Sequence, residues 1–391
     1  MTWKNRPKGI GLMGNNCKTL MAGLPPAPLE DWYRHRYFDN QIDISGSGVE
    51  EYSFGQIQKK ANFSLSELDP LNVTDGETVG SLTVRKLLAD RFGTGNPDQV
   101  MTTNGANEAL NLIARSILEP SDEVVTLGPC YHCHDKIAES IGCTVRKWTI
   151  TVGESFELDV EALKKLVSAK TKALFLNFPH NPTGISISQK TLDDIVNFVR
   201  ERDIYLVWDA VFQQLTYEKA PLKDPVLVYN KAISLGTFSK AYGAPGLRFG
   251  WIVGPEDVIA SCVRQKDYGN LFVAPIIDFV AEKMLLNLNT FAQEKLLQAT
   301  SNRELVYAWS KKPELGVNWR QPDGGVCGVL ELGTEVDDVA FCEEALKGYG
   351  VLLVPGSCFG MPSFARLGFG GNGSSLSEGL NRLEQLLITT K

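Results

Sequence analysis

Short apolar runs alternate with amphipathic segments along most of the chain from about residue 80. Apolar positions recurring at helical spacing predict helices over residues 106–118, 159–168 and 190–202. Between them, near-continuous apolar runs predict strands, which are Glu123–Leu127, Lys172–Asn177, Asp203–Trp208, Ala232–Leu235 and Gly250–Val253. Strands that are apolar on both faces belong to a parallel sheet covered by helices on each side. The pattern therefore predicts a three-layer α/β fold with a mostly parallel central sheet.

The two ends of the chain follow a different pattern. Residues 1–27 lack periodicity and lead into a proline cluster, residues 29–38 suit an amphipathic helix, and residues 43–52 form a glycine-rich loop. From about residue 290, strands at 325–331 and 351–354 and a helix at 376–387 predict a smaller α+β unit. We expect an arm at 1–27, a large domain at 49–290, and a small domain formed by 28–48 with 291–391.

Composition narrows the possible functions. A chain of 391 residues with 43% hydrophobic residues can bury a large core, and its net charge of −7 gives no basic footprint for nucleic acid. No window approaches ~18 uninterrupted apolar residues, so we expect no membrane span. The positively charged start is followed only by a weak, broken apolar stretch, which argues against secretion. Eight cysteines in a chain this long fit a reducing, cytoplasmic setting.

Three short motif matches lack the context that would make them functional. Gly9–Gly14 and Gly368–Gly373 both fit the dinucleotide pattern G-x-G-x-x-G, but neither lies inside a predicted βαβ unit. Cys130–His134 fits the haem pattern C-x-x-C-H without an export context. A zinc site in that string would need a second ligand pair at suitable spacing, which is missing. We expect loops at all three places and no metal.

The run from Ser234 to Trp251 carries the clearest chemical signal. Lys240 follows an apolar segment and suits a lysine that forms a Schiff base with a carbonyl group. Thr237 and Ser239 can donate hydrogen bonds to a phosphate, and Arg248 can pair with it through two N–H groups. The alternative is an ordinary strand-to-loop segment with a solvated lysine.

Three upstream segments favour the first interpretation. They are Met101–Ala109, with a glycine turn before a helix, Asn177–Gly184 (NFPHNPTG), and Tyr205–Phe212 (YLVWDAVF). In this order, and together with the Lys240 run, they resemble the fold-type-I pyridoxal-phosphate (PLP) enzymes, the aspartate-aminotransferase superfamily. The resemblance extends from about residue 28 to the C-terminus. It implies PLP as cofactor and a homodimer with the active sites at the subunit interface.

The resemblance assigns roles at the phosphate and ring nitrogen of PLP. Gly105 would let the backbone approach the phosphate, and the amides of Ala106 and Asn107 would bind it at a helix N-terminus. Asp209 would keep the pyridine nitrogen protonated, so that the ring draws electrons from the substrate. Without the resemblance, an aspartate after a strand is more often a helix cap or a turn residue.

Three further residues take their roles mainly from the resemblance. Asn181 would donate to the phenolic oxygen of PLP, Tyr131 would stack on its ring, and Arg366 would clamp the substrate α-carboxylate. Without the resemblance, Asn181 would be an ordinary turn residue, Tyr131 a half-buried tyrosine and Arg366 a solvated arginine. Phe212 departs from the pattern, because many aminotransferases have a tyrosine there that donates to the phenolic oxygen. Its absence argues against ordinary transamination.

A narrower resemblance comes mainly from the N-terminal segments Ala27–Phe38 and Asp43–Gly55. It is shared by Asn177–Asn181, Trp208–Asp209, Phe212 and Ser239–Gly243. These segments resemble the capreomycidine synthases and the related enduracididine-forming cyclases, PLP enzymes that remove water from a hydroxylated arginine and close a guanidine ring. The resemblance implies that Lys240 moves the α-proton and that His132 acts as the acid for the leaving hydroxyl. The substrate-contacting loop would be Ser45, Gly46 and Ser47. Candidate partners for the guanidinium are Glu30, Asp31, Asp43, Ser45, Ser47 and Glu50.

Two rival functions remain open at this point. A plain aminotransferase would explain every cofactor residue but neither the N-terminal resemblance nor Phe212. A non-catalytic PLP-binding regulator would carry a DNA-binding domain ahead of this fold, and only about 27 residues precede it here. The carbon that bears the hydroxyl, β or γ, is not specified by the sequence.

Overall fold

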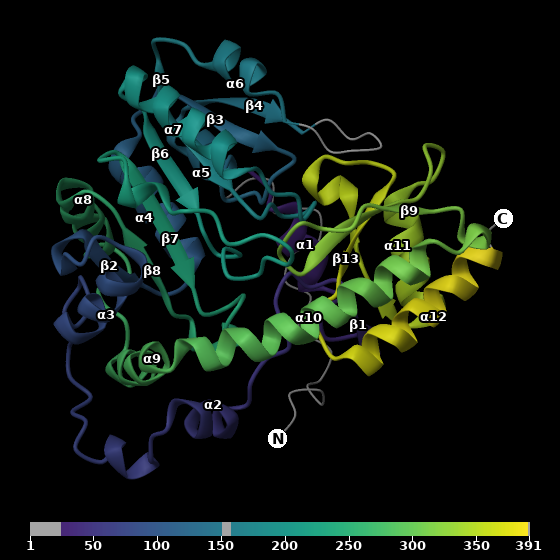
Figure 1. The fold of residues 1–391 in the computed structure, drawn as a ribbon, viewed down its shortest axis with the longest axis horizontal. Coiled ribbons are helices and arrows are strands. Elements are labelled where there is room, and N and C mark those ends of the chain that lie inside the picture. Colours follow the sequence, from purple (N-terminus) through teal and green to yellow (C-terminus); the bar gives the residue numbers. More distant parts are fainter. Residues whose placement is uncertain (1–24, 151–157, 390–391) are drawn as a thin grey trace, which may run out of the picture.

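The computed structural model describes residues 25–150 and 158–389. A larger part with a central sheet and a smaller part at the C-terminal end lie side by side, joined by the long helix α10 (Leu288–Ser310) (Figure 1). Residues 1–24, which include most of the expected arm and the Gly9–Gly14 motif, lie outside the described residues. No helix among the described residues is long and apolar enough to cross a membrane.

The larger part is built on a seven-stranded sheet in the order β2-β8-β7-β6-β5-β3-β4. Strand β8 runs opposite to the other six strands of this sheet, which confirms the mostly parallel sheet expected from the sequence. The strands are β2 (Val100–Thr103), β3 (Glu123–Gly128), β4 (Thr144–Thr149), β5 (Thr171–Asn177), β6 (Tyr205–Asp209), β7 (Ala232–Thr237) and β8 (Gly250–Val253).

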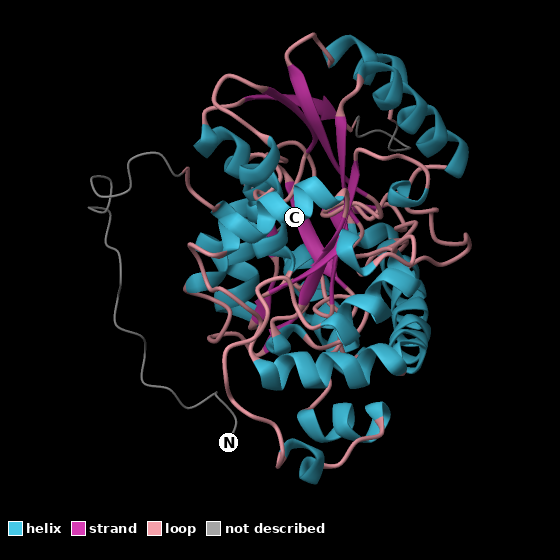
Figure 2. Cartoon of the chain, turned by 90° about the vertical axis from the view of Figure 1, so that its left-hand side faces the viewer, coloured by secondary structure: helices cyan, strands magenta, loops and turns pink. Residues whose placement is uncertain are grey.

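Helices cover both faces of this sheet (Figure 2). Successive strand residues enter opposite cores, because strand side chains alternate between faces: Val124 packs in one core and Val125 in the other. One core contains residues of α6 (Val160–Leu166) and α7 (Gln189–Arg202). The other contains residues of α3 (Leu82–Phe92), α4 (Ala106–Ile117), α5 (Lys136–Ile141), α8 (Glu256–Lys266) and α9 (Pro275–Leu286). The three layers predicted from the apolar pattern are therefore confirmed.

The smaller part contains two short sheets. A four-stranded antiparallel sheet has the order β12-β13-β10-β9, and β1 pairs with β11 in parallel. Its strands are β1 (Ile42–Asp43), β9 (Asn318–Trp319), β10 (Cys327–Glu331), β11 (Val351–Leu352), β12 (Val354–Pro355) and β13 (Phe364–Gly368), and its helices are α1 (Pro28–Arg34), α11 (Asp338–Tyr349) and α12 (Gly373–Thr389). The β1–β11 pairing joins the N-terminal segment to the C-terminal unit. The domain boundaries given above stay a prediction.

Element bounds differ from the expected ones in two instructive places. The expected helix at 29–38 ends at Arg34, and its remaining residues form turns. Strand β4 was not expected, because its sequence TVRKWT is charged and largely exposed. It lies at the edge of the sheet and pairs with β3 alone, so an apolar run is not required for it to form.

Helix α2 (Phe54–Ala61) begins at a capping box formed by Ser53 and Gln56.

The parallel strands bring the predicted motifs to one edge. Asp209 ends β6, Asn177 ends β5, and Thr237 ends β7, so the loops that follow them meet at the carboxyl edge of the sheet. Because β8 is antiparallel, its first residue lies at this edge, and Arg248 precedes it. This edge faces the smaller part of the molecule (Figure 1).

Candidate active site

A cavity of about 780 Å³ lies at the carboxyl edge of the sheet and extends to the smaller part. Residues from at least five strand ends and from the N-terminal segment line it. Twelve of the residues predicted from the sequence are among them, namely Gly46, Ser47, Ala106, Asn107, Tyr131, Asn181, Asp209, Thr237, Ser239, Lys240, Arg248 and Arg366. The structure thus brings together side chains that are up to about 320 positions apart in the chain.

Lys240 follows β7 and projects its amine into this cavity. Nζ donates a hydrogen bond of 2.9 Å to Oγ of Ser47, which comes from the smaller part. Removal of water around the amine lowers the pKa of Lys240 to about 8, and the nearby positive charge of Arg366 acts in the same direction. About a tenth of the amine is therefore neutral at pH 7, far more than for an ordinary lysine, and the neutral form is the one that acts as nucleophile or base.

Asp209 is buried at the end of β6, and its two carboxylate oxygens have separate partners. Oδ2 lies 2.9 Å from Nε2 of His134, and Oδ1 accepts the backbone N–H of Val211 at 3.1 Å. Asn177 fixes the local backbone by donating to the carbonyl of Asp209 at 2.9 Å. The result is an immobilised carboxylate in the cavity wall, suited to a cationic ring nitrogen.

His134 is a residue that the sequence analysis did not single out as functional. It lies in the C-x-x-C-H string that was set aside for lack of context, and it approaches Asp209 only through the fold, 75 positions away. Its spacing of three residues from Tyr131 within the loop after β3 was the only signal that could have found it.

Hydroxyl, guanidinium and backbone N–H groups gather at another end of the cavity. Thr237 and Ser239 lie with their hydroxyl oxygens 3.0 Å apart, and Arg248 lines the same end. Gly105 has φ +89°, and a Cβ atom on it would lie 2.4 Å from Nη2 of Arg248. A side chain there would displace the arginine, while glycine leaves the start of α4 accessible to an anion.

Arg366 on β13 is almost fully buried, and four of its donor interactions go to protein acceptors. Nε and Nη2 donate to the carbonyl of Ser45 at 3.2 and 2.9 Å, and Nη1 donates to Oδ1 of Asn181 at 3.0 Å. Nη2 also donates to the hydroxyl of Tyr33 at 2.8 Å. No carboxylate pairs with Arg366 among the described residues, so a buried positive charge faces the cavity and suits a carboxylate ligand.

Tyr33 was also missed from the sequence, where Glu30 and Asp31 were the only candidates taken from the segment that forms helix α1. Its hydroxyl joins Arg366 to the loop that contains Ser45. Tyr131 lines the cavity next to the start of α4, where its hydroxyl accepts from the side-chain amide of Asn107 at 3.0 Å and lies 3.2 Å from Oε1 of Glu30. Phe212 also lines the cavity, with its ring centre 5.7 Å from Nζ of Lys240.

The three residues of the predicted substrate loop have different roles in the structure. Ser47 contacts Lys240, and Gly46 lies against β13 so closely that a Cβ atom on Gly368 would lie 1.9 Å from the Gly46 carbonyl. Ser45 is buried, and its hydroxyl donates to Oδ1 of Asp43 at 2.6 Å instead of lining the cavity. Its contribution to the site is the carbonyl group that holds Arg366.

His132 does not line the cavity of Lys240. It lies in the wall of a separate cavity of about 580 Å³, together with Cys130 and Cys358. Its ring packs beside Tyr131 with centroids 4.4 Å apart, and burial lowers its pKa. The structure therefore does not bring His132 to the position expected for a general acid.

The lining residues fit pyridoxal phosphate. The phosphate fits the end formed by Thr237, Ser239, Arg248 and the start of α4, the buried Asp209 fits the pyridine nitrogen, and Lys240 supplies the amine for the aldehyde. Nδ2 of Asn181 is left to donate to the phenolic oxygen, because its Oδ1 already accepts from Arg366.

Comparison with known proteins agrees with this geometry. Residues 49–383 match the family model of class I and II aminotransferases. The chain is similar to capreomycidine synthase of Streptomyces vinaceus, at 36% identity over 94% of this chain and 95% of that protein. It is 29% identical to aspartate aminotransferase of Thermotoga maritima, over 78% of this chain and 80% of that protein.

Solved structures give the same result. The fold superposes on the PLP-dependent cyclase OrfR with a TM-score of 0.89 and 33% identity, covering 94% of this chain and 98% of that one. A PLP-dependent aminotransferase from Streptococcus suis also superposes with a TM-score of 0.89, at 26% identity over 94% of this chain and 99% of that one. The chain therefore belongs to the class I and II aminotransferase family of fold-type-I enzymes, and its cofactor is pyridoxal 5′-phosphate.

Proposed function

We propose that this protein is a PLP-dependent cyclase that converts a hydroxylated L-arginine, with the hydroxyl on Cβ or Cγ, into a cyclic guanidino amino acid of the capreomycidine or enduracididine type. The net reaction is loss of one water, which makes the enzyme a lyase of the hydro-lyase type. The similarity to capreomycidine synthase over nearly the whole length of both chains supports this proposal.

The distribution of charge in the cavity is the structural observation that carries the proposal. Arg366 is deeply buried, and apart from the buried Asp209 on the cofactor side, the carboxylates that line the cavity, Glu30, Asp43, Glu50 and Glu51, are more exposed than Arg366. An amino acid whose α-carboxylate binds at Arg366 would place its side chain toward these carboxylates. A hydroxylated arginine, with a carboxylate at one end and a guanidinium at the other, matches this arrangement.

The side chains supply the remaining steps. Arg366 binds the α-carboxylate and orients Cα, and bound PLP draws electrons from Cα so that its proton becomes acidic. Nζ of Lys240, kept close to Ser47 by their hydrogen bond, takes this proton. Because His132 lies outside the cavity, we infer that Lys240 also returns a proton to the leaving hydroxyl, which departs as water. A guanidine nitrogen then adds at the vacated carbon, and the proton that it loses is returned to Cα, so that one water is lost overall. With the hydroxyl on Cγ, a Cβ proton must also be removed before the hydroxyl leaves and is returned after the ring closes.

The decisive experiment offers the holoenzyme β-hydroxyarginine and γ-hydroxyarginine separately and determines product masses. Loss of one water from either substrate supports the cyclase and identifies the carbon that bears the hydroxyl. Turnover of neither would reject the proposal. Release of a keto acid with conversion of the cofactor to its amine form would establish the aminotransferase alternative instead. The homodimer and the cytoplasmic location expected from the sequence stay predictions.

A further inference from the structure

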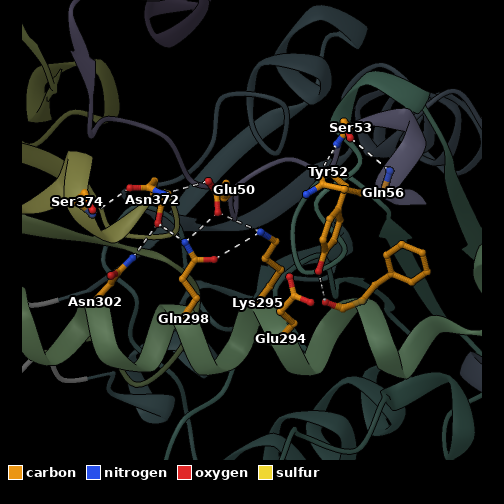
Figure 3. Close-up of polar contacts among 12 residues, drawn as sticks. Glu50, Tyr52, Ser53, Gln56, Glu294, Lys295, Gln298, Asn302, Asn372 and Ser374 are labelled. Atoms are coloured by element: carbon orange, nitrogen blue, oxygen red, sulfur yellow. Dashed lines mark hydrogen bonds and ion pairs between the residues drawn. The ribbon is translucent and has the colours of Figure 1, made fainter. Parts of the chain in front are cut away.

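The carboxylates that line the cavity differ in the number of hydrogen bonds that their oxygens already accept from the protein. Glu50 accepts from Lys295 at 3.3 Å, from Gln298 at 3.0 Å and from Asn372 at 3.4 Å (Figure 3). Lys295 is buried, and Glu50 is its ion-pair partner. Removing Glu50 from these contacts would leave a buried charge unpaired, so Glu50 serves to attach the N-terminal segment to α10.

Two of the other candidates for guanidinium binding are also occupied or remote. Asp31 does not line the cavity and pairs with Arg34 on the surface of α1. Glu30 lines the cavity on the side of Tyr131, whose hydroxyl donates to it at 3.2 Å. Tyr131 in turn contacts Asn107 at the start of α4, so Glu30 belongs to the cofactor side of the cavity and not to the side of Arg366.

Asp43 is held close to Arg366 by hydrogen bonds. Its Oδ1 accepts the backbone N–H of Ser45 at 2.9 Å and the hydroxyl of Ser45 at 2.6 Å. The carbonyl of the same Ser45 accepts from Arg366 at 2.9 Å. Oδ2 of Asp43 accepts no hydrogen bond from the described part of the chain, and pairing of β1 with β11 fixes the backbone at this position. A preorganised carboxylate oxygen is therefore available a short way from the carboxylate clamp.

Glu51 adds a second negative charge to the lining of the cavity. It lines the cavity together with Tyr37, and the pKa of Tyr37 is raised to about 12 by burial and then by the charges of Asp43 and Glu51. Both carboxylates therefore face the surroundings of one tyrosine hydroxyl. Two carboxylates on one side of a cavity favour a cation over a neutral group of the same shape.

We propose that Asp43, assisted by Glu51, binds the guanidinium of the substrate and selects arginine-type amino acids. This inference rests on the cyclase function proposed above. A substrate bound by its carboxylate at Arg366 and by its guanidinium at Asp43 has its two ends close together, because Ser45 contacts both residues. The side chain must then fold back over its own Cβ and Cγ. This conformation brings a guanidine nitrogen to the carbon it attacks, which raises the effective concentration of the nucleophile.

The test compares binding of L-arginine and L-citrulline to the holoenzyme and to its Asp43→Asn variant. Citrulline has the same shape with a neutral end, and neither amino acid carries the hydroxyl that cyclisation needs. Binding is followed by the change in near-visible absorbance of the bound cofactor. We expect the wild type to prefer arginine and Asp43→Asn to lose this preference by tenfold or more through weaker arginine binding. Asparagine keeps the acceptor for Ser45, so the loop conformation is retained.

Glu30→Gln is the matched control, because it removes another carboxylate of the same cavity. It should keep the preference for arginine. The inference is overturned if Asp43→Asn keeps the preference, if arginine and citrulline weaken equally, or if Glu30→Gln loses it. Cyclisation of hydroxyarginines by the wild type is measured separately. Selective arginine binding without cyclisation would reject the cyclase alone, whereas cyclisation with an unaffected Asp43→Asn variant would reject the guanidinium site alone.

Discussion

Nε2 of His134 lies 2.9 Å from Oδ2 of Asp209, and both side chains are buried, with Asp209 in the lining of the cavity and His134 outside that lining. The imidazole satisfies one carboxylate oxygen, so the negative charge of Asp209 can stay in a dry environment until a cationic ring nitrogen pairs with it. We therefore expect the reaction to need the charge of this carboxylate rather than its hydrogen bonds.

Asp209→Asn tests this point. The amide keeps the shape and one acceptor but loses the charge, so we expect turnover to fall at least ~100-fold, the order found when a single preorganised electrostatic group is removed. The cofactor should remain bound, because Lys240 and the phosphate contacts are unchanged. Steady-state kinetics and the absorbance of the bound cofactor measure the two effects. A variant with wild-type turnover would show that Asp209 has no electrostatic role.

Lys240 should react with the cofactor with a pH dependence that reports its lowered pKa. Only the neutral amine attacks an aldehyde, so the rate of cofactor uptake by the cofactor-free protein should rise with pH and level off above about pH 8. Growth of near-visible absorbance after addition of pyridoxal phosphate measures this rate. Lys240→Ala should give no such absorbance. A rate that continues to rise toward the ordinary lysine pKa of 10.5 would contradict the lowered value.

Phe212→Tyr restores the hydroxyl that many aminotransferases have at this place. Phe212 lines the cavity close to Lys240, so the new hydroxyl should reach the phenolic oxygen of the bound cofactor and stabilise its negative charge. We expect the pH at which the cofactor absorbance changes to be lower in the variant than in the wild type. A pH titration followed by absorbance gives both midpoints, and equal midpoints would mean that the hydroxyl does not reach this oxygen.

Asp224 offers a prediction about stability that is independent of the active site. Burial raises its pKa from 3.8 to about 6, although Ser234 donates to it at 2.6 Å. The folded protein therefore binds more protons than the unfolded chain between these two values, and the free energy of unfolding falls as pH rises through this window. Asp224→Asn cannot ionise and should be more stable than the wild type above pH 6 by about 1–3 kcal/mol.

Urea unfolding at pH values above and below this window measures the difference. The gain should shrink as the pH falls from 6 to 3.8 and be lost below 3.8, where the wild-type carboxyl is neutral in both the folded and the unfolded protein. Asp224 does not line the cavity of Lys240, so turnover should be unaffected, which also makes this variant a control for Asp209→Asn. Equal stability of the two proteins above pH 6 would contradict the raised pKa.

The sequence predicted the core of the sheet and the cofactor end of the site because both are encoded locally. Apolar runs specify β5, β6 and β7, and the residues that follow each run reach the same edge whenever the strands are parallel. The local string around Lys240 indicated its chemistry, whereas the role predicted for Asp209 came from the resemblance to the PLP enzymes. Edge strand β4 could not be predicted, since its charged sequence carries no such pattern.

Contacts between segments that are distant in the chain could not be predicted from the sequence. Tyr33 meets Arg366 although they are 333 positions apart, and no local pattern announces such a pairing. His132 was favoured by its position next to Tyr131, but consecutive residues in a loop point in different directions, and His132 faces a different cavity. Ser45 and Ser47 seemed equivalent in the sequence, yet only Ser47 reaches Lys240.

The single antiparallel strand, β8, places two expected cofactor-binding residues on one connection. Because β8 returns alongside β7, the turn between them carries the covalent anchor near its beginning and Arg248 near its end. The connection between β7 and β8 therefore sets the distance between the amine that we expect to bind the aldehyde and the arginine that we expect to bind the phosphate. An insertion or deletion in that connection would change the distance between Lys240 and Arg248. We therefore expect its length to vary far less than the lengths of the surface loops at the opposite edge of the sheet.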